Sequence, residues 1–266
     1  LFNNLALSCF IIFRMDIIHI HGFKCAGTTL EKILFREYPD LLRVENSHGG
    51  KRLFYEDISP ELLSVGAISS HLLAPQKESS SLQISLIRDP YKRLVSAWKF
   101  QKNIVKDIDE TFREHINKYK NSVISNYQCK LLSLQNKGAH FNSGWNFNLD
   151  LDFIFGDSFF LGVVERFDES MVLLEHRLDK RGIQIDLSYP SIQNSTKDVK
   201  QKKELNDFSK FAYPSTDADT WLWKMANDKM DYQIRKIPSF NDKLKNYKER
   251  CENSMFPKKN LNVIKI

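Results

Sequence analysis

The sequence predicts a single-domain α/β protein with a parallel β-sheet that is flanked by helices on both faces. Short apolar runs, typical of buried strands, alternate along the chain with segments whose apolar residues repeat at helical spacing. Hydrophobic residues make up 42% and charged residues 27% of the 266 residues, which excludes collagen-like and wholly disordered classes. No internal repeat or linker divides the chain, which is long enough to bury one large core.

The first predicted strand covers residues 15–21, where three isoleucines precede Gly22, and the first helix covers 28–38 and ends before Pro39. Further strands are predicted at 64–69, 82–87 and 159–164, and further helices after Pro90, twice within 107–134, and over 168–181 and 216–236. The last helix is expected to turn four apolar side chains inward, namely Trp221, Leu222, Met225 and Met230. Residues 188–204 are polar and rich in lysine, and they are predicted to form a loop.

Three regions are predicted along the chain: an N-terminal extension at 1–14, the domain at 15–237 and a basic C-terminal tail at 238–266. The extension is apolar but shorter than the roughly 20 residues that span a bilayer, and it lacks the basic flank and cleavage site of a signal peptide. We interpret it as an upstream addition to a chain that starts near Met15, with a truncated membrane anchor as the alternative. The composition of the tail is compatible with partial disorder.

The cysteines and the absence of apolar spans bear on where the protein works. The four cysteines lie far apart and form no CxxC pair or zinc-like cluster, so free thiols in a reducing compartment are the simplest account. We therefore expect a cytoplasmic protein, whereas a Golgi-lumen enzyme would require an N-terminal helix that has been lost. No segment predicts stable insertion into a membrane.

The chain carries 39 Lys and Arg against 33 Asp and Glu, a net charge of +6. This excess favours anionic partners such as nucleotides, phosphates, acidic glycans, nucleic acids or membrane surfaces, although a basic surface that only aids solubility explains it equally well. Because no helix-turn-helix, zinc-finger or RNP-like pattern is present, nucleic acid is not the expected partner.

The first strand leads into a segment that predicts an anion site, residues 21–30 (HGFKCAGTTL). Gly22 and Gly27 have the GxxxxG spacing of a phosphate-binding loop, and the helix that follows directs amides and its positive dipole end to the same point. Thr28 replaces the lysine of that loop, and Lys24 is the only nearby lysine, so a Mg²⁺-dependent nucleoside-triphosphate enzyme fits poorly. A strand–helix connection with an incidental lysine is the alternative.

A second anion site is predicted where the strand at 82–87 ends in Arg88-Asp89-Pro90. An arginine in this position can grip a phosphate through two parallel hydrogen bonds. Ser96 lies just over two helical turns further on and could share that phosphate if the helix folds back over the site. The alternative is a local ion pair between Arg88 and Asp89, with Ser96 on the helix surface.

Together the two segments resemble the sulfotransferases that use 3′-phosphoadenosine 5′-phosphosulfate (PAPS). Residues 23–29 (FKCAGTT) resemble the 5′-phosphosulfate loop PKTGGTT, with Phe23 and Cys25 as departures, and residues 88–96 (RDPYKRLVS) resemble the 3′-phosphate motif RDPxxRxxS. Their order and spacing match the branch with heparan sulfate 2-O-sulfotransferases and many bacterial carbohydrate sulfotransferases. Weaker echoes lie at 126–128, 162–167 and 194–197. The resemblance runs from about residue 15 to about residue 235.

This resemblance implies the P-loop-like sulfotransferase fold, PAPS as the sulfuryl donor, no metal, and a carbohydrate hydroxyl as the acceptor. It implies that the donor is bound by Lys24, Cys25, Ala26, Gly27, Thr28, Thr29, Arg88, Ser96 and Lys197. Lys24 would also stabilise the charge that grows on the bridging oxygen of the leaving phosphate. The lysines within 197–203 could close over the 3′-phosphate of the donor or meet an anionic acceptor, and a solvated charged loop is the alternative.

His71 is the expected general base. It follows the second predicted strand, so it should reach the carboxyl edge of the sheet, and its imidazole can accept a proton near neutral pH. The resembling branch also has a histidine in this region. The alternative is a histidine that only packs at a strand end; His21, the rival base, is expected to pack beneath the first loop.

Two other functions remain open on the sequence. An ATP-dependent small-molecule kinase with a divergent phosphate loop is the first, and the missing lysine at position 28 argues against it. A non-catalytic protein that binds anionic glycans or nucleic acids through its basic surface is the second.

Overall fold

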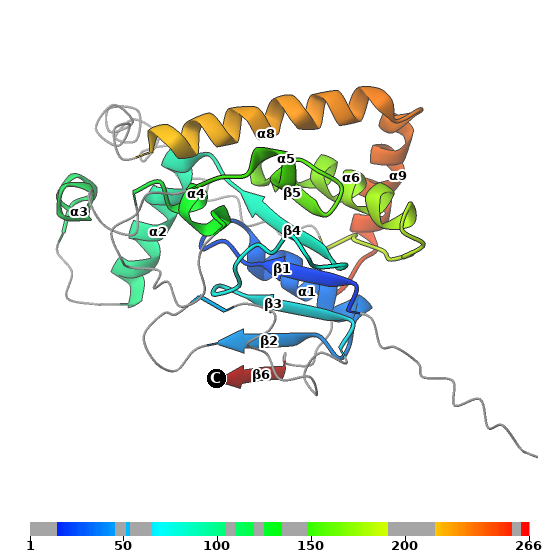
Figure 1. Cartoon of the computed structure of the whole chain (residues 1–266), viewed down its shortest axis with the longest axis horizontal. Helices are drawn as coiled ribbons and strands as arrows, with labels where there is room; N and C mark the ends of the chain where they lie inside the picture. The colour runs from blue at the N-terminus through cyan, green and yellow to red at the C-terminus, as the bar shows by residue number, and fades with distance from the viewer. Residues whose placement is uncertain are drawn as a thin grey trace, which may run out of the picture.

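The fold is described by a computed structural model for residues 15–45, 52–53, 65–104, 110–119, 125–134, 148–190, 216–256 and 262–265. Among these residues, six parallel strands form one sheet in the order β5-β4-β1-β3-β2-β6 (Figure 1). The strands are β1 (Ile17–Ile20), β2 (Leu42–Glu45), β3 (Ala67–Ser70), β4 (Leu82–Ile87), β5 (Phe159–Val163) and β6 (Asn262–Lys265). The predicted single-domain α/β class with a parallel sheet flanked by helices is confirmed.

The helices are α1 (Gly27–Glu37), α2 (Pro90–Ile104), α3 (Phe112–Tyr119), α4 (Tyr127–Leu132), α5 (Leu151–Ile154), α6 (Phe167–Asp179), α8 (Asp217–Lys236) and α9 (Phe240–Glu252). A short 3-10 turn, η3 (Val164–Arg166), links β5 to α6. The two helices predicted within 107–134 are confirmed as α3 and α4. Strand β2 was not predicted, because its four residues alternate between apolar and charged and are too few to show a period.

The middle of the sheet is buried on both faces. Every residue of β1, β3, β4 and β5 is buried, so these strands are rich in apolar residues, and their few polar side chains, such as His19, Ser69 and Gln83, are buried as well. Helices α6 and α8 pack against β5, and α9 packs on α6. A second, smaller core joins α2 to α3 through Leu94, Val95, Phe112 and Ile116.

The strand order places a functional site at one edge of the sheet. Strand β1 lies between β3 and β4, so the chain adds β3 on one side of β1 and then crosses to add β4 on the other. Ligands of open parallel sheets bind at such a switch point, outside the carboxyl ends of the strands. In Figure 1 the arrowheads of β2, β4 and β6 point to the left, where α2 and α4 lie, whereas α6 and α9 lie at the right.

The C-terminal residues differ from the basic tail that the sequence predicts. Helix α9 packs on α6, with Tyr247 fully buried and its hydroxyl donating to the Leu187 carbonyl oxygen at 2.9 Å. Strand β6 then pairs with β2 at the edge of the sheet. Only Phe240, Tyr247 and Cys251 of α9 are buried, and so narrow a stripe does not stand out among lysines and asparagines.

Helix α8 buries a narrower face than predicted. Leu222, Ala226 and Met230 form its buried stripe at intervals of four residues, whereas Trp221 is 47% exposed. Successive residues of a helix are turned by about 100°, so Trp221 does not share the face of Leu222. The prediction that the Trp221 ring points inward was wrong.

Several predictions concern residues that the structure does not describe. These are the N-terminal extension at 1–14 and most of the predicted loop at 188–204, which includes Lys197. Cys25, Cys129 and Cys251 are buried free thiols, as predicted. Within the described ranges, no helix combines the length and apolarity needed to cross a bilayer.

Candidate functional site

Four neighbouring strands end at the same edge of the sheet, and a charged or polar side chain follows each. Lys24 follows β1 and Arg88 follows β4, at the centre of the sheet. His71 follows β3 on one side, and Glu165 follows β5 on the other. The fold thus gathers at one edge the loop, the arginine motif and the histidine that the sequence singles out.

The loop after β1 presents open backbone amides. Lys24 and Ala26 adopt the left-handed conformation, with φ of 63° and 57°, and the amide of Cys25 donates back across the turn at 3.1 Å. Left-handed residues that alternate with ordinary ones turn successive N–H groups to the same side, which forms an anion-binding concavity. Within the described part of the chain, the amides of Gly27 and Thr28, the first of α1, donate to no other group. The positive end of the α1 dipole adds to their attraction for an anion.

Gly27 is required because the His21 ring packs directly against the loop. His21 is buried beneath it, as predicted, and a Cβ on Gly27 would lie 1.9 Å from His21 Cδ2. We expect Gly27→Ala to lower the free energy of unfolding by about 3 kcal/mol or more. The reason is that neither the buried His21 ring nor the first turn of α1 has room to move away from the added methyl group. Denaturant unfolding measures this effect.

Gly22→Ala is the matched control for that variant. A Cβ on Gly22 would lie 3.2 Å from Cys25 Cβ and from the Leu86 carbonyl oxygen, far less close than the 1.9 Å at Gly27, so we expect Gly22→Ala to cost less stability than Gly27→Ala. Equal stability losses in the two variants would contradict the close packing of His21 against Gly27.

The two predicted anion-binding segments touch each other. Arg88 donates through Nη1 to the carbonyl oxygen of Lys24 at 3.3 Å. Burial, and then the neighbouring Arg88 charge, lower the pKa of Lys24. Arg88 Nε is buried without a hydrogen bond to any described residue, and it lies 3.9 Å from Glu165 Oε1. An anion bound here would relieve the repulsion between the two cations.

Two residues to which the sequence assigned no role hold these segments together. The Gln128 side chain accepts the Arg88 amide at 2.7 Å and donates to the Arg88 carbonyl oxygen at 2.9 Å. The same side chain accepts the Cys25 thiol at 3.4 Å. The Tyr127 hydroxyl accepts the backbone amide of Phe23 at 3.0 Å. Their only signal in the sequence was the weak family echo that contains them.

The thiol of Cys25 is turned away from the loop surface. The side chain is buried against Gln128, and this burial raises the pKa of the thiol to about 12. Cys25 therefore offers a ligand no side-chain donor, and its amide already donates to the Gly22 carbonyl oxygen, so the concavity depends on the neighbouring amides of Gly27 and Thr28.

Helix α2 folds back over the loop. The Lys24 ammonium lies 4.5 Å from the centre of the Phe100 ring. Ser96 precedes Phe100 by one helical turn, and residues four apart share a helix face, so Ser96 lies on the side of α2 that faces the loop. The Asp89 carboxylate accepts the Lys92 amide at 2.9 Å and caps the start of α2.

His71 is held in one tautomer. Its Nδ1 lies 2.8 Å from the backbone carbonyl oxygen of His21, which can only accept, so Nδ1 carries the proton. Burial, and then the neighbouring His21 ring, lower the pKa of His71 to about 4. The ring is therefore neutral at pH 7, and its Nε2 has a lone pair available for a proton.

Beneath His71 lies a buried network of histidines around one carboxylate. The His21 ring lies 3.9 Å from the His71 ring, and its Nδ1 lies 3.3 Å from Glu31 Oε1, which also accepts the Ser69 hydroxyl at 2.6 Å. Burial alone would raise the pKa of Glu31, but its histidine and serine partners lower it to about 2, so the carboxylate is ionised. His19, His21 and Glu31 are the described residues whose ligand atoms are close enough, within 4.8 Å, for a metal ion.

All the site residues predicted from the sequence, except one, lie among the residues that the structure describes. Residues 24–26 form the loop and 27–29 the first turn of α1, Arg88 contacts the loop, and Ser96 lies on α2 one helical turn before Phe100. His71 stands at the end of the next strand, against the histidine that supports the loop. Lys197 lies outside the described residues.

Comparison with known proteins identifies the family. The family model described as the sulfotransferase family matches residues 10–154, more than half of the chain. The chain therefore belongs to the sulfotransferase family, whose members transfer sulfuryl groups. No curated protein matches the chain. Among solved structures, a sulfotransferase from Alicyclobacillus acidocaldarius is similar, with 12% identity and a TM-score of 0.42 over 79% of this chain and 99% of that one.

Proposed function

We propose that this sulfotransferase moves a sulfuryl group from PAPS to a hydroxyl of a carbohydrate. The observation that carries the proposal is the contact of Arg88 with the loop at Lys24, because it brings the two predicted anion-binding segments together at one edge of the sheet. A donor that carries a phosphosulfate at one end and a separate phosphate on its ribose needs two such segments side by side. A ligand with one phosphate would need only one of them.

The chain's own residues divide the binding of the donor. Lys24, Ala26 and the open amides of Gly27 and Thr28 would hold the phosphosulfate, and Thr29, whose amide donates to the Ala26 carbonyl oxygen, stays a predicted donor contact. Arg88 and Ser96 would hold the 3′-phosphate, since arginine matches phosphate in geometry as well as in charge. Lys197 stays a predicted donor contact. The scheme needs no metal ion, because the lysine and the amides supply the positive field.

The proposed reaction is an in-line displacement at sulfur. The acceptor oxygen forms a bond to sulfur while the bond from sulfur to the bridging phosphate oxygen breaks, which releases adenosine 3′,5′-bisphosphate. Lys24 stabilises the negative charge that develops on that bridging oxygen. His71 Nε2 takes the proton of the attacking hydroxyl, and its Nδ1 stays bonded to the His21 carbonyl oxygen throughout.

The carbohydrate acceptor is supported by the motifs and by one exposed ring beside the loop. The spacing of the two motifs resembles the carbohydrate branch of the family. The Phe100 ring is 39% exposed and lies next to the Lys24 ammonium, where the face of a sugar could stack on it.

Transfer of labelled sulfate from PAPS to a panel of glycans tests this proposal. We expect label in at least one carbohydrate without added divalent metal. Failure of transfer from PAPS, together with Mg²⁺-dependent phosphate transfer from ATP, would identify a kinase and overturn the proposal.

The pH dependence of turnover tests the role of His71 directly. The neutral ring is the active form, so activity is lost as the pH falls through the pKa of His71 in the folded protein. Because that pKa is lowered to about 4, we expect kcat at saturating donor to stay level from pH 7 down to about 5 and to halve near pH 4. Circular dichroism at each pH separates titration from unfolding. A midpoint near the ordinary histidine pKa of about 6.5 would contradict a buried base.

A further inference from the structure

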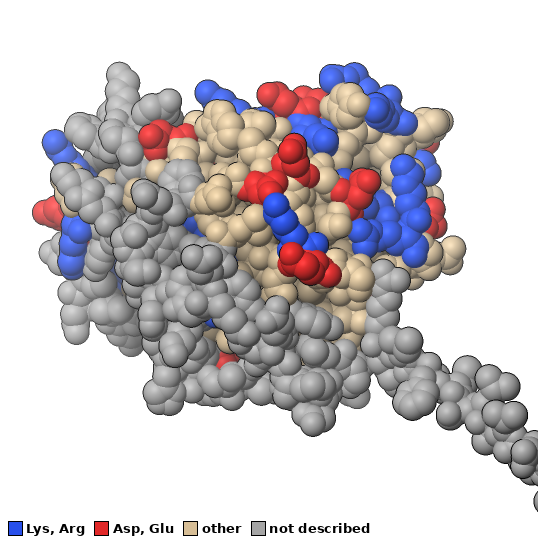
Figure 2. All heavy atoms as spheres, viewed as in Figure 1, with Lys and Arg blue, Asp and Glu red and all other residues tan. Residues whose placement is uncertain are grey.

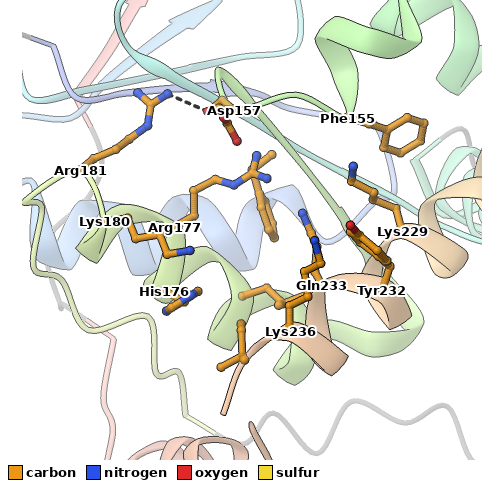
Figure 3. Close-up of a pocket in the computed structure, with 13 residues that line it drawn as sticks. Phe155, Asp157, His176, Arg177, Lys180, Arg181, Lys229, Tyr232, Gln233 and Lys236 are labelled. Atoms are coloured by element: carbon orange, nitrogen blue, oxygen red, sulfur yellow. Dashed lines mark hydrogen bonds between the residues drawn. The ribbon is translucent and has the colours of Figure 1, made fainter.

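A cavity of about 490 Å³ lies at the edge of the sheet opposite the candidate site. Its lining comes from α6, α8 and the segment that leads into β5 (Figure 3). Arg177 donates to the Gly156 carbonyl oxygen at 3.0 Å, and Arg181 donates to that of Asp157 at 2.7 Å, both at the amino end of β5. The candidate site lies at the carboxyl ends of the strands, so this cavity is separate from it.

The lining carries uncompensated positive charge. Its five cations are Arg177, Lys180, Arg181, Lys229 and Lys236, against the single acid Asp157. Within the described ranges none of the five forms an ion pair with a carboxylate, whereas Arg166 and Arg250 nearby are each paired twice. Figure 2 shows Lys and Arg side chains gathered at the right of the molecule, over α6 and the end of α8. An anion in the cavity would relieve their repulsion.

The two arginines are fixed by backbone groups. Arg177 Nη1 also donates to the Phe159 carbonyl oxygen, and its guanidinium lies 5.6 Å from the centre of the Phe160 ring. Arg181 also donates to the Ser80 carbonyl oxygen at 3.3 Å. In Figure 3 Arg177 extends into the middle of the cavity, between Lys180 and Lys229. Positive charge is therefore in position before a ligand binds, which lowers the entropic cost of binding.

Tyr232 adds an aromatic face to the cavity. Its side chain is 46% exposed, and the ammonium groups of Lys236 and Lys229 lie 4.2 and 5.8 Å from the centre of its ring. A hydrogen bond with Lys236 lowers the pKa of the Tyr232 hydroxyl. An exposed ring between two lysines suits a sugar ring that carries negative groups on its rim.

We infer that this cavity binds a saccharide segment that carries sulfate or carboxylate groups. Its lysines come from two helices and surround the Tyr232 ring. This arrangement suits a ligand whose negative charges are single and lie at separate positions around a sugar ring. A compact polyphosphate would favour converging backbone amides, but α6 and α8 present their carboxyl-terminal turns here, where the helix dipoles repel concentrated negative charge. The inference does not depend on the proposed catalytic function, because it uses other residues at the opposite edge.

Calorimetric titration with a fully sulfated heparin tetrasaccharide tests the inference. Saturating adenosine 3′,5′-bisphosphate is added to occupy the candidate donor site. We expect the triple variant Lys180→Gln, Lys229→Gln and Lys236→Gln to bind the tetrasaccharide at least about tenfold more weakly than the natural chain. We expect Tyr232→Ala to weaken binding several-fold at unchanged net charge, and Tyr232→Phe to retain it.

The matched control replaces Lys224, Lys245 and Lys248 by glutamine, which removes the same charge from exposed positions outside the cavity. An equal loss in this control would show non-specific attraction and overturn the inference. Titration with inorganic tripolyphosphate provides a second check. If it binds more tightly than the tetrasaccharide, and if Tyr232→Ala leaves its affinity unchanged, the site is a polyphosphate site and the inference is overturned. Arg88→Ala should leave tetrasaccharide binding unchanged, so a failure of the proposed catalytic function remains distinguishable.

Discussion

Replacing Arg88 by alanine is expected to weaken the binding of adenosine 3′,5′-bisphosphate by about 30-fold or more. Arg88 reaches the loop through its bond to the Lys24 carbonyl oxygen, and its Nε is buried without a hydrogen bond to a described residue. The loss of a desolvated charged contact costs about 2–5 kcal/mol, and every 1.4 kcal/mol is tenfold in affinity. Calorimetric titration of the purified variants measures it.

Lys92→Ala is the matched control for this experiment. Lys92 lies in the same motif, and its replacement removes the same positive charge. The Lys92 side chain is exposed, however, and its Nζ lies 3.9 Å from Glu165 Oε1. We expect its affinity for the nucleotide to change about twofold or less, as for exposed ion pairs. Lys24→Ala should lose both affinity and turnover. If Arg88→Ala binds adenosine 3′,5′-bisphosphate as tightly as the natural chain and its unfolding transition is unchanged, the proposed donor site is wrong.

Replacing His71 by alanine is expected to lower kcat by about 100- to 10,000-fold while nucleotide affinity is kept. The reason is that His71 Nε2 is the proposed proton acceptor, whereas the donor is held by other strand ends. Steady-state transfer rates at saturating donor measure the loss, and the same calorimetric titration measures the retained affinity.

His71→Gln separates proton transfer from positioning. A glutamine amide can still donate to the His21 carbonyl oxygen, as His71 Nδ1 does, but it cannot take up a proton at neutral pH. We expect this variant to be as inactive as His71→Ala. Near-natural turnover in His71→Gln would show that the side chain only supports the site, and another base would have to be sought.

The elements that the sequence predicted well are those whose pattern is dictated by burial. Strand β4 was predicted at its observed bounds because a strand buried on both faces is mostly apolar, and only Gln83 and Ser85 interrupt its apolar run. Strand β6 and helix α9 were missed for the converse reason, since a short edge strand and a helix with a narrow buried stripe need few apolar residues. Trp221 was misplaced because hydrophobicity alone does not assign a helix face.

The residues of the candidate site also fall into two groups, those that the sequence predicted and those that it did not. Lys24, Arg88 and His71 were found because each follows a predicted strand, and parallel strands end at one edge. Gln128 was not recognised, because its bonds to Arg88 and Cys25 span distant parts of the chain and depend on how α4 packs. The spacing of residues within a motif shows only which residues are close in the sequence. Hydrogen bonds such as those of Gln128 form between distant segments and depend on the tertiary structure.

The pairing of β2 with β6 has a consequence for how the molecule is made. Leu42 emerges from the ribosome early, whereas its partner Asn262 emerges after almost all other strands and helices. Until then the outer edge of β2 is an open template for intermolecular pairing. Growth of the sheet on this side therefore waits for late synthesis, and shielding by a chaperone in that interval would matter more here than for a sheet built from neighbouring segments.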